Sequence, residues 1–421
     1  MAERMDAIVM GGGPGGATAG LMLARAGWRV AAIEKARFPR RKVCGEYLSS
    51  TNFPLLRRLG VAEEFLRQAG PPVQQTALFA REIVVTAPLP RTKEMPDGWG
   101  RAVGREVLDT LLLERAAEAG AQVRQPWAAT SVEKRGDVFL CEATSKETRE
   151  KERLCAPLVI AAHGSWEPGT LPTQPARPPA RGSDLLGFKA HFCDCSLPNG
   201  VMPLLIFPGG YGGMAQTNDG RVVVSYCIRR DELERWRRAA PDKSAAETVS
   251  SRVRESCRGA REALARARQD GPWLSVGPIR PGVRAWFSDG IFCVGNAAAE
   301  AHPIIAEGIS MAIQSAWLLC EGLLARGRGS WPGDTLGEIG RQYARAWRKS
   351  FLPRLRAAEV FAQLAMRPFP AALFVSLFRS FPALVTLTAR WSGKARQVVP
   401  SGESVPRSRD RRGGFPHQPD S

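Results

Sequence analysis

A run of closely spaced glycines near the start of the chain restricts what the first forty residues can form. The stretch Gly11-Gly12-Gly13-Pro14-Gly15-Gly16 follows the apolar residues 7–10 and precedes residues 17–26, which are rich in Ala and Leu. A second apolar stretch, residues 30–33, ends at Glu34. Strand, glycine turn, helix, strand and acid in this order are typical of a βαβ unit that binds a dinucleotide.

The glycines of this turn have separate expected roles. Gly11 permits the tight turn, Gly13 lets the backbone approach a pyrophosphate, and Gly16 lets helix and strand pack closely. The pyrophosphate then lies over the free N–H groups of the helix N-terminus. The carboxylate of Glu34 accepts hydrogen bonds from both ribose hydroxyls and disfavours a 2′-phosphate, so the unit fits FAD or NAD better than NADP.

The composition limits the class of protein. The 421 residues are 44% hydrophobic and 24% charged, as in an ordinary globular chain long enough for two or three domains. The net charge of +18 comes largely from dispersed arginines, without a recognisable nucleic-acid module, so we expect no nucleic-acid partner. The nine cysteines are scattered and no apolar leader precedes residue 6, which predicts a cytoplasmic protein with reduced thiols.

Three potential metal ligands alternate in one β-rich segment. His191, Cys193 and Cys195 would share one face of a strand. A fourth ligand is missing from the pattern, which favours small buried thiols over a metal centre. We therefore predict no metal site.

The C-terminal segment is apolar enough to raise the question of a membrane span. Residues 369–389 contain one charged side chain, Arg379, but Pro370 and Pro382 interrupt them. This pattern favours two short amphipathic helices, packed on the body or resting on a membrane surface, over a transmembrane helix. Residues 396–421 lack hydrophobic periodicity and predict a disordered basic tail.

Two further segments point to the same ligand as the βαβ unit. Gly104-Arg105 opens a helix, where the guanidinium of Arg105 can lie beside a pyrophosphate. The third segment contains Gly295-Asn296, Pro303 and Glu307-Gly308-Ile309. With these motifs, residues 5–325 resemble the FAD-dependent oxidoreductases of the aromatic-ring hydroxylase and geranylgeranyl reductase superfamily.

The resemblance implies positions for the flavin end of FAD. Asn296 would bind the ribityl chain, and the helix that begins at Gly308 and Ile309 would point its positive N-terminus at the flavin ring. The loop Arg41-Lys42-Val43-Cys44-Gly45 is similar to a segment that runs along the flavin in the reductase branch. A solvated basic loop is the alternative for Arg41 and Lys42.

Several positions depart from the superfamily pattern. Asn296 replaces the usual Asp and brings no charge, and His163-Gly164 replaces an Asp-Gly motif associated with FAD and NAD(P)H handling. NAD(P)H as electron donor is therefore left open. The Trp-x-Trp-x-Ile-Pro signature of flavin-dependent halogenases does not occur, so halogenation is not expected. His302 is the candidate catalytic residue, and a hydrogen-bonded loop histidine is its alternative reading.

The resemblance implies an α/β fold in which a Rossmann-like FAD-binding domain of the glutathione-reductase type holds an inserted β-sheet substrate domain. The expected divisions are 1–75, 100–175 and 275–330 for the FAD-binding domain, 76–99 and 176–274 for the substrate domain, 331–395 for a C-terminal helical cap, and 396–421 for the tail.

The predicted function is that of an FAD-dependent oxidoreductase, in first place a flavin monooxygenase acting on a hydrophobic small molecule. A geranylgeranyl-reductase-like enzyme that reduces C=C bonds is the alternative, and a non-catalytic FAD-binding protein at a membrane surface is a second one. Peripheral membrane contact through the C-terminal helices is left open. The residues expected to contact FAD are Gly11, Gly13, Pro14, Gly15, Gly16, Glu34, Lys35, Arg41, Cys44, Gly45, Arg105, Asn296, Gly308 and Ile309.

Overall fold

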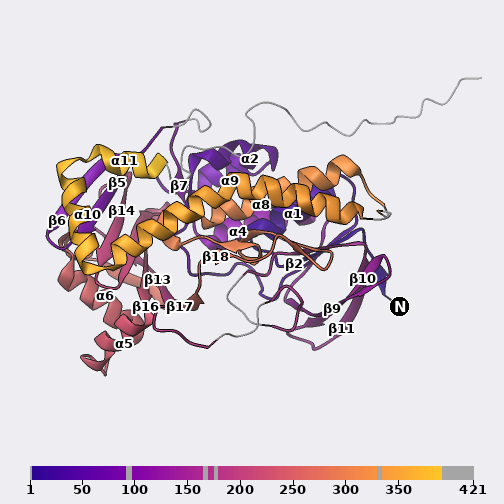
Figure 1. Ribbon diagram of the computed structural model, residues 1–421, viewed down its shortest axis with the longest axis horizontal. Helices are drawn as coiled ribbons and strands as arrows, with labels where there is room; N and C mark the ends of the chain where they lie inside the picture. The colour runs from indigo at the N-terminus through magenta and orange to yellow at the C-terminus, as the bar shows by residue number, and fades with distance from the viewer. Residues whose placement is uncertain are drawn as a thin grey trace, which may run out of the picture.

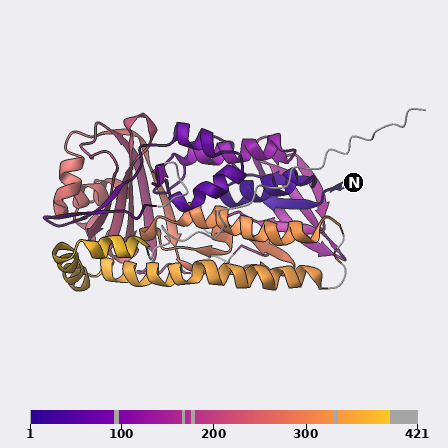
Figure 2. The ribbon, with the colours of Figure 1, turned by 90° about the horizontal axis from the view of Figure 1, so that it is seen from above.

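Two sheet-based units lie side by side along the long axis of the molecule, and a long helix runs past both (Figures 1 and 2). The computed structural model describes residues 2–91, 97–164, 169–174, 179–329, 331 and 334–390. The predicted tail, residues 396–421, lies outside the described residues.

The first unit is built on a six-stranded sheet with strand order β19-β20-β12-β2-β3-β8. All neighbours pair in parallel except β19 with β20. The strands β2, β3 and β12 are short, apolar and buried along their whole length, because both faces of the sheet are covered. The strand bounds are Phe287–Ser288 (β19), Ile291–Cys293 (β20), Leu158–Ala161 (β12), Ala7–Met10 (β2), Val30–Ile33 (β3) and Gln122–Arg124 (β8).

Successive side chains of these strands point to opposite faces of the sheet, and each face is covered by a further layer. The unit therefore has three layers. Val9 and Ile160 face a helical layer, whereas Ile8 and Val159 face a second sheet. The helices are α1 (Pro14–Arg25), α4 (Arg105–Glu118) and α8 (Gly308–Arg326). The second sheet has the order β1-β11-β10-β9, with bounds Glu3–Arg4, Lys151–Ala156, Val138–Ser145 and Trp127–Arg135.

The second unit is a seven-stranded sheet with order β17-β13-β16-β15-β14-β5-β6, antiparallel except between β14 and β5. One face packs on helices α5–α7, with Phe207, Val224 and Val249 in the shared core. The strands are Arg268–Ile279 (β17), Leu185–Cys193 (β13), Val222–Arg229 (β16), Gly210–Gln216 (β15), Val201–Phe207 (β14), Gln75–Ala80 (β5) and Ile83–Pro88 (β6), and the helices are Arg230–Arg238 (α5), Ala245–Ser256 (α6) and Arg258–Ala263 (α7).

Three helices form a cap along the other face of this sheet. They are α9 (Thr335–Met366), α10 (Pro368–Ser380) and α11 (Ala383–Ala389). Helix α9 contacts α8 and β19 in the first unit and β14 and β15 in the second (Figure 2). Pro382 separates α10 from α11, as the sequence predicts two short helices there.

One described helix, α8, has the length and hydropathy of a membrane span. Most of it is buried, and it packs against α1 and α9. Its apolar sequence is therefore accounted for by contacts within the protein core.

Two helical segments of the structure are interrupted. Residues 52–68 form α2 (Phe53–Arg58) and α3 (Ala62–Gln68), separated at Gly60, which has φ +67°. This left-handed backbone ends the first helix. The charged stretch 231–268 is divided into α5, α6 and α7, and β17 already begins at Arg268.

Candidate active site

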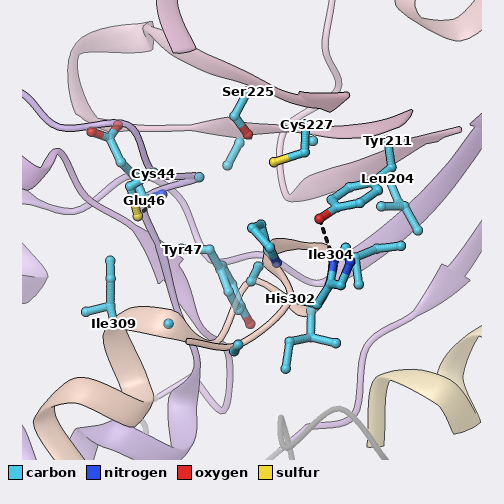
Figure 3. A pocket seen from close by; sticks show the side chains of 18 of the residues that line it. Cys44, Glu46, Tyr47, Leu204, Tyr211, Ser225, Cys227, His302, Ile304 and Ile309 are labelled. Carbon is cyan, nitrogen blue, oxygen red and sulfur yellow. Dashed lines mark hydrogen bonds between the residues drawn. The ribbon is translucent and has the colours of Figure 1, made fainter. Parts of the chain in front are cut away.

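A cavity of about 570 Å³ lies where the six-stranded sheet, the seven-stranded sheet and the cap meet. Its walls come from the glycine turn after β2, the loop 42–47, strands β14 to β16, the start of α8 and the cap helices. Figure 3 shows side chains from the loop 42–47, from strands β14 to β16 and from the segment 302–309 around this cavity. Segments far apart in the sequence thus contribute to one site.

The glycine turn has the close contacts that its sequence predicts. Gly11 has φ +115°, and a Cβ atom there would lie 2.5 Å from the carbonyl oxygen of Ala162. A Cβ at Gly16 would clash with the backbone of Gly11, so this glycine is required for α1 to pack on β2. Gly13 faces the cavity, and a Cβ there would meet only Arg40, at 4.0 Å. This turn leaves room for a phosphate group above the N-terminus of α1.

Glu34 is buried at the end of β3 and is held against this turn. Its Oε2 accepts a hydrogen bond of 2.7 Å from the backbone N–H of Gly12, and its Oε1 accepts one of 2.9 Å from Ala36. Lys35 beside it is exposed. The guanidinium of Arg40 lies 3.9 Å from Glu34 and 3.5 Å from Asp109. Sequence reasoning missed Arg40, whose position depends on Asp109 in another element.

Arg105 begins α4 and is buried in an ion pair. Its Nε and a terminal nitrogen each donate a hydrogen bond of 2.7 Å to the carboxylate of Asp109. Burial lowers the pKa of Arg105, but the charge and hydrogen bonds of Asp109 outweigh this and raise it above its ordinary value. Arg105 lines the cavity as a permanent cation.

Lys42 lines the cavity together with Arg105 and lies within the electrostatic influence of Arg40. Desolvation, together with the charges of Arg105 and Arg40, lowers the pKa of Lys42 to about 8. Arg40, Lys42 and Arg105 are cations, and Glu34 and Asp109 are carboxylates, so the group has one more positive charge than negative charges. This excess suits an anionic group next to the glycine turn.

The loop 41–46 turns only some of its side chains toward the cavity. Lys42, Cys44 and Gly45 line it. Arg41 is exposed and lies away from it, with its guanidinium 3.9 Å from the carboxylate of Asp270 on β17. Of the two basic residues, Lys42 thus belongs to the site and Arg41 to the contact between the loop and the second unit.

A fully buried carboxylate, Glu46, fixes this loop to β13. It binds the ammonium group of Lys189, receives a hydrogen bond of 3.1 Å from the backbone N–H of Arg105, and lies 2.9 Å from Nε2 of His191. Burial raises the pKa of Glu46, but the hydrogen bond to His191 and the charge of Lys189 outweigh it and leave the pKa below its ordinary value. The loop is held by these contacts.

The same cluster includes a group of potential metal ligands. Glu46, Glu106 and His191 are the group of potential ligands that lie close together among the described residues, and Cys193 and Cys195 do not belong to it. The cation on Glu46 is the ammonium of Lys189. His191 is therefore a structural partner of Glu46.

Asn296 and the start of α8 reach the cavity from the other side. Asn296 lies in a 3₁₀ turn (Gly295–Ala297), and its amide donates a hydrogen bond of 3.4 Å to Glu300. Gly308 and Ile309 form the first residues of α8 and line the cavity. The structure thus brings these predicted residues to the same cavity as Gly13, Pro14, Gly15, Cys44, Gly45 and Arg105.

Tyr211 and His302 form a hydrogen-bonded pair on the cavity wall. The phenol oxygen of Tyr211, on β15, lies 2.6 Å from Nδ1 of His302, which precedes the turn Pro303–Ile305 (Figure 3). Burial lowers the pKa of His302 to about 4 and raises the pKa of Tyr211 well above its ordinary value. Both side chains are therefore uncharged at neutral pH. The sequence singled out His302 but did not identify its partner.

His163 is accounted for by local hydrogen bonds. Its ring nitrogens lie 2.9 Å from the carbonyl oxygen of Gly164 and 2.8 Å from the hydroxyl of Thr173. Gly164 lines the cavity, whereas His163 holds the turn.

Beyond the Tyr211–His302 pair, the cavity is apolar as far as the cap. The apolar residues that line this part are Leu78, Leu89, Met202, Leu204, Ile304, Ile305, Phe361, Phe378, Val385 and Leu387. The site therefore has a cationic end at the glycine turn and an apolar end under the cap.

Comparison with known proteins agrees with this arrangement. Residues 4–343 match the model of the FAD binding domain family. Digeranylgeranylglycerophospholipid reductase 2 of Methanopyrus kandleri is 26% identical over 380 residues, which cover 86% of this chain and 87% of that protein. The FAD-dependent monooxygenase OpS4 of Beauveria bassiana is 28% identical over 175 residues, 39% of this chain and 38% of that protein.

The fold also resembles that of solved flavoenzymes. The structure of the myxobacterial chondrochloren halogenase superposes with a TM-score of 0.71 over 93% of this chain and 91% of that one, at 22% identity. This likeness supports a Rossmann-like FAD domain with an attached sheet. The chain belongs to the FAD binding domain family and is an FAD-dependent oxidoreductase.

Proposed function

We propose that the enzyme is a flavin monooxygenase that hydroxylates a long apolar molecule carrying a hydroxylated ring. The observation that carries the proposal is the uncharged Tyr211–His302 pair at the point where the cavity becomes apolar. Such a pair orients a ring hydroxyl by accepting its hydrogen bond, and the apolar walls beyond it receive a hydrocarbon chain.

The residues of the cationic end fit FAD. Glu34 would bind the ribose, Gly13 and Gly15 with the N-terminus of α1 would approach the pyrophosphate, and Arg40, Lys42 and Arg105 would balance its charge. Asn296 would contact the ribityl chain, and Gly308 and Ile309 would lie at the flavin ring. Bound FAD supplies the redox chemistry, which is the activation of O₂ in its reduced form.

The protonation states of Tyr211 and His302 favour hydroxylation over C=C reduction. Reduction of an isolated double bond needs an acid that gives a proton to carbon. His302, with a pKa of about 4, is uncharged at neutral pH, and Tyr211 holds its proton more tightly than a phenol in water. The pair is thus a poor acid, but its oxygen and nitrogen atoms can accept a hydrogen bond from a substrate hydroxyl.

The pair can hold a substrate hydroxyl by hydrogen bonds. A substrate hydroxyl beside Tyr211 donates a hydrogen bond to the phenol oxygen, while the phenol hydroxyl donates its own hydrogen bond to Nδ1 of His302. The substrate oxygen gains electron density, which activates the ring toward an electrophilic oxygen. The surrounding apolar side chains exclude water from the reacting ring.

Oxygen labelling tests the proposal. The FAD-loaded enzyme, reduced with dithionite and then mixed with ¹⁸O₂ and 4-nonylphenol, should yield a product that contains one ¹⁸O atom, detected by mass spectrometry. Absence of label from products of 4-nonylphenol and of other long-chain phenols would contradict a monooxygenase. Oxidation of NADH or NADPH in the same assay would identify the electron donor, which we propose to be NAD(P)H.

A C=C reductase is the second candidate. It is favoured by the similarity to digeranylgeranylglycerophospholipid reductase 2 over 86% of the chain, and by the position of Cys44 and Gly45 on the cavity wall. An enzyme of this kind, reduced without O₂, should convert geranylgeraniol to a product two hydrogen atoms heavier. Detection of that product, with no labelled phenol, would replace the first proposal by the second.

A further inference from the structure

Large apolar side chains that face solvent are concentrated in the cap. In the described part of the chain, seven of the nine most exposed large hydrophobic residues lie between Val360 and Leu387. Phe369 is 83% exposed and Phe381 is 60% exposed. We call these residues the cap surface: Val360, Leu364, Phe369, Leu373, Leu377, Phe381 and Leu387. Such a concentration of exposed apolar side chains on three consecutive helices is typical of an interaction site.

The charges around the cap surface are almost all positive. Arg356, Arg367, Arg379 and Arg390 are exposed, and Glu359 is the single acidic residue between positions 356 and 390. Exposed arginines beside exposed phenylalanine and leucine are the combination that binds an anionic lipid surface.

The cavity extends to the same helices. Phe378, Val385 and Leu387 line it from α10 and α11, and Leu387 is also 46% exposed. One side chain thus borders both the apolar end of the cavity and the cap surface. Figure 1 shows α10 and α11 at the end of the molecule away from β9 to β11.

We infer that the cap surface docks on an anionic lipid bilayer, so that the apolar end of the cavity receives its substrate from the membrane. The entry of substrate rests on the proposed function, whereas the docking does not. The substrate would then be a molecule that partitions into lipid.

A second copy of the chain fits this surface less well. In a two-fold dimer the same patch lies on both sides of the interface, which would bring Arg367 and Arg379 toward the arginines of the second copy. An anionic bilayer instead offers opposite charge to each of them, and its acyl region accepts Phe369 and Phe381.

Vesicle flotation tests the docking with the full chain loaded with FAD. The protein should float with phosphatidylcholine vesicles that contain about 30% phosphatidylglycerol, and less with pure phosphatidylcholine. Replacing Phe369→Ser and Phe381→Ser together should lower vesicle partitioning about tenfold or more. The matched control, Val84→Ser with Val283→Ser, removes two exposed valines outside the cap and should leave partitioning unchanged.

The outcomes separate docking from catalysis. The Phe369/Phe381 variant should retain bound FAD and full turnover of detergent-solubilised substrate, because neither side chain lines the cavity. Equal flotation of this variant and the valine control would overturn the docking. Loss of a dimer in the variant, with no flotation of the wild type, would assign the surface to a second copy. Flotation without turnover of 4-nonylphenol would contradict the proposed function alone.

Discussion

The hydroxyl of Tyr211 lies 2.6 Å from Nδ1 of His302, although the two residues are 91 positions apart in the chain. Tyr211 comes from the second sheet, and His302 comes from the loop that leads into α8. This hydrogen bond therefore connects the two units. The orientation of each ring depends on how the two units pack against each other.

Replacing Tyr211→Phe should separate catalysis from cofactor binding. The variant keeps the ring but removes the hydroxyl that orients the substrate, so kcat should fall about tenfold, while FAD affinity stays unchanged. Steady-state kinetics with 4-nonylphenol and fluorescence titration of FAD measure the two effects. Unchanged kcat would exclude a role for the hydroxyl in orienting the substrate.

His302 should make the stability of the fold depend on pH. Its pKa falls from 6.5 in the unfolded chain to about 4 in the folded protein because of burial, so the unfolded state binds more protons between these values. The free energy of unfolding should therefore decrease as pH falls from 6.5 toward 4, by about 2 kcal/mol between pH 7 and pH 5 from this residue alone. Urea denaturation of wild type and His302→Gln measures the difference, and the same pH dependence in both proteins would contradict the assignment.

Glu34→Ala should weaken FAD binding. The substitution removes the acceptor for the ribose and also frees the N–H groups of Gly12 and Ala36 that hold the turn. We expect a rise in Kd of about 10- to 100-fold, corresponding to about 1–3 kcal/mol. Glu34→Gln, which retains one acceptor oxygen, should show an intermediate Kd. Wild-type affinity in Glu34→Ala would mean that the cofactor lies elsewhere.

FAD affinity should also depend on the charge of Lys42. Its pKa of about 8 places the loss of the ammonium charge within the accessible pH range. Affinity for the anionic cofactor should be highest below pH 8 and should fall as pH rises above it, with proton uptake on binding near pH 8. Lys42→Arg keeps the charge and should remove the pH dependence. A pH-dependent Kd that persists in Lys42→Arg must come from another group.

Substitutions in the ion pair of Arg105 and Asp109 should affect the stability of the fold and the affinity for FAD in different ways. In Arg105→Met, the buried carboxylate of Asp109 loses its ion pair with Arg105 and keeps only the one with Arg40, at 3.5 Å. Because a buried charge is then poorly compensated, the fold should be destabilised by about 3–5 kcal/mol. Adding Asp109→Leu should restore much of this stability without restoring FAD affinity. Recovery of both properties in the double variant would show that Arg105 serves only the fold.

The local geometry of the glycine turn could be predicted from the sequence. Gly11, Gly16 and Glu34 lie within one short βαβ unit, where chain order fixes spatial order and positive φ selects glycine. Helix α8 also begins at Gly308 and Ile309, as the resemblance implies.

The remaining contacts depend on folding of distant segments. Arg41 and Lys42 are chemically similar neighbours, and no local pattern indicates that one pairs with Asp270 and the other faces the cavity. The same holds for Glu46, which is neutralised by Lys189 some 143 positions away. At Gly60, apolar residues continue at helical spacing on both sides, so that the left-handed backbone that separates α2 from α3 leaves no trace in the apolar pattern.

Helix α9 has a mechanical consequence. Its 32 residues form one rod that is packed on α8 and β19 at one end and on β14 and β15 toward the other. Rotation of the two units relative to each other would separate α9 from one of them. Side chains such as Trp347 or Ala362 would then become exposed, which costs the free energy gained by their burial. Helix α9 thus joins the two units through buried side chains on both, so that a change in their relative orientation is opposed by the loss of this burial.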